Sequence, residues 1–257
     1  MQLWTYEHAI TVLPGLAIMV LLAMILRKFL KDKPYQVRMI PISVIAVVLV
    51  LLELGKQGTS LVRGYDLYCL PFHFCSLFIF MLPLMAFYKG KGKKTIAAIT
   101  TALCMSVFLL MLIYPNLIYG PGNIENFFRH YLDFHTVAFH NLVLFASILV
   151  IALQLHEPQT KGEQKAILLF IGAFCMVSAS MAQILKTNFA NFYSCNIGPL
   201  EAVRLSIQEV LGYGATQGLY ILILTLLNLG FVLMCYWLCR LLLRFARSKK
   251  AQIAPAI

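Results

Sequence analysis

Long apolar runs constrain this chain more than any other feature of its sequence. Seven stretches of about 20 mostly apolar residues follow one another, and a helix of that length crosses the roughly 30 Å hydrocarbon core of a bilayer. Their approximate limits are 9–29, 40–62, 69–88, 95–114, 131–155, 166–185 and 217–239. In lipid, backbone polar groups must be bonded within their own segment, which favours helices. We therefore predict an all-α polytopic transmembrane bundle of about seven spans, with residues 1–257 as a single domain.

The composition agrees with a membrane protein. Hydrophobic residues make up 61% of the chain and charged residues 12%, with a mean hydropathy of +0.82, whereas soluble domains are about half apolar and a quarter charged. The net charge of +11 could indicate a nucleic-acid partner. The basic residues, however, lie in short clusters between apolar runs, where they act as topology signals. We expect membrane lipids as partners and no nucleic acid.

The distribution of basic residues predicts the topology. Sixteen of the 21 Lys and Arg residues follow the first, third, fifth and seventh spans. The opposite side holds four, which are Arg63, Arg129, Lys186 and Arg204. Because positive residues stay on the cytoplasmic side, we expect the N-terminus outside and the C-terminus inside. The start, MQLWTYEHAI, has no basic region or cleavage pattern typical of a signal peptide. The sizeable outer loops are predicted at 115–130 and 186–216.

Polar side chains inside the spans gather toward the predicted outer face. An ionisable group in the hydrocarbon region costs about 2.5–3.5 kcal/mol on insertion scales, so it normally faces a bundle interior or a wet cavity. The residues concerned are Glu53 and Lys56 in span two, His73 and Cys75 in span three, Asp133 and His140 in span five, and Gln183 and Lys186 at the end of span six. The inner halves of spans three, five and six are almost purely apolar. This asymmetry predicts a cavity that opens toward the outer face.

Helical spacing predicts which groups in span three lie together. At about 100° per residue, Cys69, His73 and Ser76 share one face of a helix, and Cys75 points away from it. Pro71 would lie within the first turn, where its missing amide hydrogen costs little.

Two further pairs follow from helical spacing. Asp133 and His140 are seven apart on one face, and their rise of about 10 Å allows Asp133 to orient His140 only through intervening groups. Glu53 and Lys56 are three apart and could pair. A structural ion pair is an equal alternative to a substrate-binding role for this pair. His130 and His135 are expected to be wetted near the interface, and most cysteines to be small packed residues.

Three segments carry a resemblance to a known family: LPFHFCSL, then FFRHYLDFHTVAFHNLVLF, then KTNFANFYSCNIGP. Together they resemble the YwaF family of bacterial multi-pass membrane proteins, over about residues 65–220. That family is related to a eukaryotic transmembrane family implicated in fatty-acyl transfer between phospholipids. The resemblance implies a bacterial cytoplasmic membrane location and a lipid-directed acyltransferase or hydrolase.

The resemblance also implies roles for single residues. The eukaryotic relatives have Pro-Cys-His where this chain reads Pro71, Phe72 and His73, and that cysteine is the proposed acyl acceptor. Phe72 cannot be a nucleophile, so Cys75, Cys69 or Ser76 would have to substitute. The family's later histidine matches His140.

An acyl transfer needs a nucleophile, a base and donors to an oxyanion. The expected catalytic group is His140, His73, Cys75, Cys69, Ser76 and Asp133. The expected substrate-binding group is Glu53, Lys56, Gln183, Lys186, Asn188, Asn191 and Asn196, with the asparagines or the backbone amides of the NIGP segment as oxyanion donors. No cofactor or metal is predicted, and a homo-oligomer is left open.

Two alternatives use the same polar groups. One is a transporter or a small-molecule-binding membrane protein, in which Glu53 and Lys56 would form a coupling or packing pair. The other is a zinc-dependent intramembrane hydrolase that uses His73, His140 and Asp133, although their spacing matches no recognised zinc motif.

Overall fold

The computed structural model describes residues 4–117, 119, 122–158 and 161–253, and helices are the only regular secondary structure in that part of the chain. The long helices are α1 (Tyr6–Leu30), α2 (Tyr35–Val62), α3 (Leu77–Phe87), α4 (Lys93–Ile113), α5 (Tyr131–Ala152), α6 (Lys161–Leu185) and α7 (Gly198–Ile253). Short 3-10 turns are η1 (Leu67–Cys69), η2 (Phe74–Ser76), η3 (Pro115–Leu117) and η4 (Phe189–Asn191). All but α3 are long and apolar enough to cross a membrane. The predicted polytopic helical bundle is confirmed.

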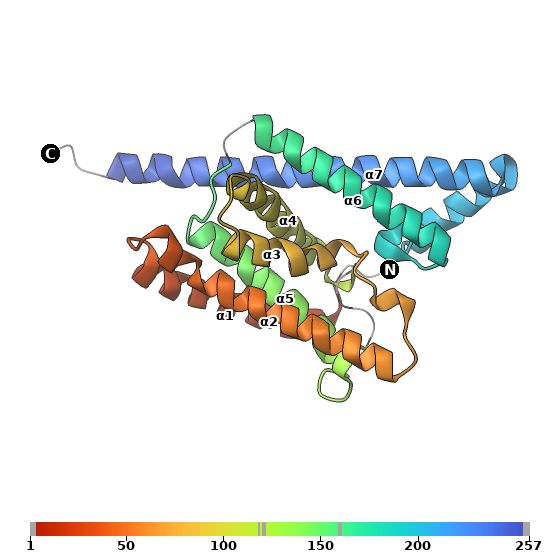
Figure 1. Ribbon diagram of the computed structural model, residues 1–257, viewed down its shortest axis with the longest axis horizontal. Helices are drawn as coiled ribbons and strands as arrows, with labels where there is room; N and C mark the ends of the chain where they lie inside the picture. Colours follow the sequence, from red (N-terminus) through yellow and green to blue (C-terminus); the bar gives the residue numbers. More distant parts are fainter. Residues whose placement is uncertain (1–3, 118, 120–121, 159–160, 254–257) are drawn as a thin grey trace.

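Helix α4 forms the centre of the bundle. It packs against α3, α5, α6 and α7 (Figure 1). Its middle is rich in small buried side chains, among them Ala97, Ala98, Ala102 and Ser106. Small residues let helix backbones approach closely, which is how helices associate in lipid without a hydrophobic driving force. Leucine, valine and isoleucine side chains on α1, α2, α6 and α7 remain exposed on the outside of the bundle, as a lipid-facing surface requires.

The third predicted span is correct in place and wrong in extent. Helix α3 has 11 residues, and at 1.5 Å per residue it is about 16 Å long, roughly half a hydrocarbon core. The chain from Leu67 to Ser76 is two 3-10 turns joined by extended backbone. Pro71 therefore does not begin a helix. Proline disfavours helical backbone in the residue before it, and Leu70 is extended, with φ −61° and ψ 145°.

Other boundaries also differ from the prediction. The loop expected at 186–216 contains a helix over residues 198–211, which belongs to α7 and is set off by a kink at Gly212. Gly212 has φ 76° and ψ 164°, a conformation that is open to glycine and costly for other residues. After the kink, α7 continues to Ile253, well beyond the predicted end of the seventh span.

The ends of α2 and α6 and the starts of α3, α5 and the long part of α7 lie at one end of the bundle (Figure 1). This is the end that the basic residues predict to be outside, and we refer to it as the predicted outer end.

Candidate functional site

The site is built on non-helical backbone, and side chains from neighbouring helices satisfy that backbone. In the segment from Leu67 to Ser76, the Cys69 carbonyl accepts a hydrogen bond from Gln57 Nε2 on α2 at 2.8 Å. The Phe72 carbonyl accepts one from Ser178 Oγ on α6, also at 2.8 Å. Non-helical backbone at membrane depth is tolerated only where protein or water satisfies it. The side chains of Gln57 and Ser178 therefore let the chain remain non-helical here.

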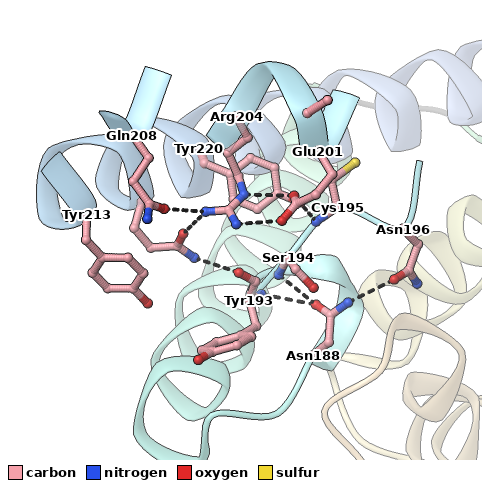
Figure 2. Close-up of polar contacts among 12 residues, drawn as sticks. Asn188, Tyr193, Ser194, Cys195, Asn196, Glu201, Arg204, Gln208, Tyr213 and Tyr220 are labelled. Carbon is pink, nitrogen blue, oxygen red and sulfur yellow. Dashed lines mark hydrogen bonds and ion pairs between the residues drawn. The ribbon is translucent and has the colours of Figure 1, made fainter. Parts of the chain in front are cut away.

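A second irregular segment, residues 186–197, lies against the first. It contains three non-glycine residues with positive φ, namely Lys186, Ala190 and Asn191. Gln217 on α7 donates to the carbonyls of Phe192 and Tyr193 at 2.8 and 3.2 Å, and Tyr220 donates to the Asn191 carbonyl at 2.6 Å. Within the segment, Asn188 Oδ1 accepts from the amides of Tyr193 and Ser194 (Figure 2). Side chains again replace the missing helical bonds.

The two segments meet through aromatic rings. The ring of Phe189 lies edge-on to the rings of Phe72 and His73, with centroids 5.3 and 5.5 Å apart. Phe189 is fully buried, so the contact is part of the core. The first segment is thereby held from α2, from α6 and from the second segment.

Between these segments and helices α4, α5, α6 and α7 lies a cavity of about 350 Å³, which we name the histidine cavity. Its polar lining is Tyr68, His73, Cys75, His140, Asn188, Asn191, Asn196 and Asn228. The rest of the lining is apolar and includes Phe74, Phe174 and Phe231. An apolar pocket with a few convergent polar groups is the usual form of a small-molecule site.

The His140 hydrogen bond fixes the tautomer of its neutral ring. His140 Nδ1 lies 2.7 Å from the carbonyl oxygen of Thr136, one turn earlier on α5. A carbonyl can only accept, so the proton is on Nδ1 and the lone pair is on Nε2. No residue that the structure describes forms a hydrogen bond with Nε2. His140 thus offers a base at the wall of the histidine cavity, oriented by Thr136 rather than by Asp133.

His73 has a different role. Its Nε2 donates to the Tyr68 carbonyl at 3.1 Å, and its Nδ1 accepts a long contact of 3.5 Å from the Ala190 amide. Both ring nitrogens are therefore occupied by backbone groups, one from each irregular segment. The ring also lies 4.3 Å, centroid to centroid, from that of Tyr68. His73 links the two segments at the cavity wall.

The structure separates the three candidate nucleophiles. Cys75 lines the histidine cavity. Cys69 and Ser76 are buried and are not part of the cavity lining. The predicted stripe of Cys69, His73 and Ser76 does not form, because the segment is not helical.

The predicted ion pair of Glu53 and Lys56 is present, with Lys56 Nζ 2.7 Å from Glu53 Oε1. It lies outside the cavity lining. Glu53 also accepts from Gln57 at 2.7 Å, and its second oxygen is 3.4 Å from His135 Nε2. His135 is buried, so the expectation that it is wetted at the interface is wrong. The Glu53 carboxylate is the polar group beside the buried His135 ring nitrogen.

The remaining candidates lie apart from the cavity. Asp133 accepts from Asn123 at 2.5 Å. Gln183 donates to the Phe192 carbonyl at 3.0 Å and accepts from Tyr213 at 2.9 Å, and Lys186 is exposed. In the described part of the chain, no three His, Cys, Asp or Glu side chains are grouped to hold a metal ion.

Several residues of the site were missing from the prediction. Asn228 lies in the middle of the last span and could have been found as the one amide within an apolar run. Tyr68 precedes the predicted third span, and no sequence pattern indicated that it would line a cavity. Gln57, Ser178 and Gln217 act on backbone carbonyls, and no sequence pattern marks that role.

A protein-family comparison identifies the chain. The model described as the TMEM164 family matches residues 3–236, and the chain therefore belongs to the TMEM164 family. No curated protein and no solved structure matches the chain.

Proposed function

We propose that this member of the TMEM164 family is a membrane enzyme that transfers a fatty-acyl group between lipids, with Cys75 as the nucleophile and His140 as the general base. One observation carries the proposal: the histidine cavity brings together a thiol, a histidine whose Nε2 lone pair is available and several side-chain amides. The same proposal places the chain in the YwaF branch and in a bacterial cytoplasmic membrane, with the cavity toward the outer leaflet.

In the first half of the reaction, His140 Nε2 takes the Cys75 proton as Sγ attacks the ester carbonyl of a lipid. A thiol needs such a base, because the thiolate is the reactive form. The tetrahedral intermediate collapses to a thioester on Cys75, and the lipid alkoxide leaves with the proton from His140. The Nδ1 bond to Thr136 supports the imidazolium that forms in between, because Nδ1–H remains a donor in both charge states.

In the second half, the hydroxyl of an acceptor lipid attacks the thioester and gives its proton to His140, which returns it to the Cys75 sulfur. Water in place of the lipid hydroxyl would make the enzyme a hydrolase. The carbonyl oxygen carries negative charge in both tetrahedral intermediates, and amide donors stabilise such a charge. Asn191 and Asn196 supply them. Asn196 accepts from Asn188 through Oδ1 at 3.0 Å, which leaves its Nδ2 hydrogens as donors.

The first test compares the lipidomes of cells that produce the wild type, His140→Ala or His130→Ala at matched membrane levels. His130 is exposed at the start of the same helix, so its variant controls for the loss of a histidine. We expect the wild type and His130→Ala to shift the acyl-chain distribution relative to empty vector, and His140→Ala not to shift it. A shift that persists in His140→Ala overturns the proposed mechanism.

The second test looks for the thioester itself. Intact-protein mass spectrometry of the purified protein in phospholipid nanodiscs should show an added acyl mass that neutral hydroxylamine removes. The adduct should be absent in Cys75→Ala and present in Cys104→Ala, which removes a buried cysteine away from the cavity. Lipidomes that are identical for wild type and empty vector, with no adduct, would favour the transport or binding alternative.

A further inference from the structure

The helix over residues 198–211, which we name the hairpin helix, carries an apolar face with no protein against it. Leu200, Val203, Val210 and Leu211 are 55%, 57%, 82% and 53% exposed, and Ile207 is 36% exposed. At about 100° per residue these five side chains fall within one arc of roughly 100°. Glu209, which is also exposed, falls on the opposite side, as does Leu205 at 45% exposed, and Ser206 lies beside the arc, about 40° from Val210. Five of the six large aliphatic side chains of the hairpin helix therefore lie on one face.

The remaining edge of the hairpin helix is fixed to the protein through polar contacts (Figure 2). Glu201 accepts from the Cys195 amide at 2.8 Å and pairs with Arg204 at 2.6 Å. Arg204 also donates to Gln208 and to Gln217 at 3.3 and 3.1 Å. These bonds join the hairpin helix to residues 186–197 and to the start of the long part of α7. They set which way the apolar face points.

The apolar face lies next to a helix whose length and composition suit a membrane span. Arg204 lies beside Gln217 and over the ring of Tyr220, 5.7 Å from its centroid. Because the chain reverses at Gly212, Leu200 lies further along α7 than Arg204 does, toward Leu222 and Ile223. These two side chains are 55% and 47% exposed on a membrane-spanning helix. The exposed apolar side chains of the two helices therefore lie at the same level along α7.

We propose that the apolar face of the hairpin helix is inserted into the lipid of the outer leaflet, with Leu200 deepest and Val210 nearest the headgroups. Ten residues separate these positions, which corresponds to about 15 Å along the helix. Glu209 then faces water or headgroups, as polar side chains do in amphipathic helices at membrane interfaces. The proposal does not depend on the acyl-transfer chemistry.

The exposed apolar face argues against a location of the hairpin helix entirely in water, although the sequence predicted residues 186–216 as an outer loop. In water, the five side chains would form a contiguous exposed apolar surface, which soluble surfaces avoid. Lipid is the occupant to which we commit, because the neighbouring part of α7 is an exposed apolar surface on a candidate membrane span. A second copy of the chain is the competing occupant, and the experiment separates the two.

The test uses nitroxide labels on the full chain in phospholipid nanodiscs. Cys75 and Cys195 are replaced by serine, since the other five cysteines are buried. Single cysteines are then placed at Leu200, Val203 or Val210, and at Glu209 as the matched control on the opposite side. We expect the ratio of oxygen to nickel-chelate accessibility to be several-fold higher at Val203 than at Glu209, and to fall from Leu200 to Val210.

Two results would overturn the proposal. Equally low ratios of oxygen to nickel-chelate accessibility at Val203 and Glu209 would place the hairpin helix in water. Low accessibility to both reagents at Val203, with dipolar broadening between labels in nanodiscs that hold two copies, would place a second copy on this face. As a second measurement that needs no label, Val203→Asp should lower the thermal midpoint more than Leu205→Asp does, because Leu205 is an exposed apolar residue on the opposite side and only the first variant puts a charge into lipid.

Discussion

Replacing Gln57 by leucine tests whether side chains from the helices hold the irregular segment in place. Gln57 Nε2 donates to the Cys69 carbonyl at 2.8 Å and to Glu53 at 2.7 Å. An orphaned buried carbonyl costs about 1–3 kcal/mol, and a lost hydrogen bond to a charged group about 1.5–3 kcal/mol. The Tyr65 hydroxyl also loses its acceptor. The burial of a leucine side chain offsets part of these losses, so we expect Gln57→Leu to lower the free energy of unfolding by about 3 kcal/mol.

The assay follows the exposure of buried cysteines to a thiol-reactive fluorogenic dye on heating, in detergent. Five of the seven cysteines are buried, so unfolding gives a large signal. In a chain of this size, a loss of about 3 kcal/mol corresponds to a midpoint lower by about 6–12 °C. Leu54→Ala is the control on the same helix, where the side chain is 63% exposed and the expected change is within about 0.5 kcal/mol. A Gln57→Leu midpoint equal to that of Leu54→Ala would refute the reasoning.

Two further predictions use the same assay. Lys56→Met should lower the free energy of unfolding by about 3–5 kcal/mol, because it leaves the buried Glu53 carboxylate without its cation. The double variant Glu53→Gln with Lys56→Met should recover most of that loss, because no buried charge then lacks a partner. Equal midpoints for the single and double variants would contradict this. Burial lowers the pKa of His156 below its usual 6.5, against the opposing effect of Glu163. Because the unfolded chain then takes up the proton first, stability is complete above about pH 6.5 and is lost as the pH falls toward the lowered pKa. His156→Gln should make the thermal midpoint depend less on pH over this range, and an unchanged slope of midpoint against pH would contradict the prediction.

The sequence predicted the bundle because the signal for a membrane helix is local. A run of some 20 apolar residues has few other stable structures in lipid, so the positions of α1, α2, α4, α5 and α6 follow from hydropathy alone. The prediction made the third span longer than α3 for the same reason, because hydropathy reads only the local sequence. The run from Cys69 to Tyr88 is apolar enough to be a span, but its first third is kept out of the helix by Pro71 and by bonds to Gln57 and Ser178. Both partners lie outside the run, Gln57 12 residues from Cys69 and Ser178 106 residues from Phe72, and hydropathy does not register such bonds.

The candidate site was predicted in part for a similar reason. The cost of placing a polar group in lipid is a property of single residues, and it singled out His73, Cys75 and His140, which the fold brings to one cavity. It also singled out Glu53, Lys56 and Gln183, which bond elsewhere. The cost indicates that a polar side chain needs a partner. It does not indicate whether that partner is a ligand, another side chain or a backbone carbonyl.

This distinction bears on which residues should matter for chemistry. Gln57, Ser178, Gln183 and Gln217 each donate to a backbone carbonyl of an irregular segment, so their hydrogen-bonding capacity is used by the fold. His73 belongs with them, since both of its ring nitrogens contact backbone. His140 differs, because its Nδ1 is bonded within its own helix and its Nε2 is left for the cavity. In the proposed mechanism His140 is therefore the histidine that acts on the substrate, and His73, in the proline-containing segment, forms part of the cavity wall.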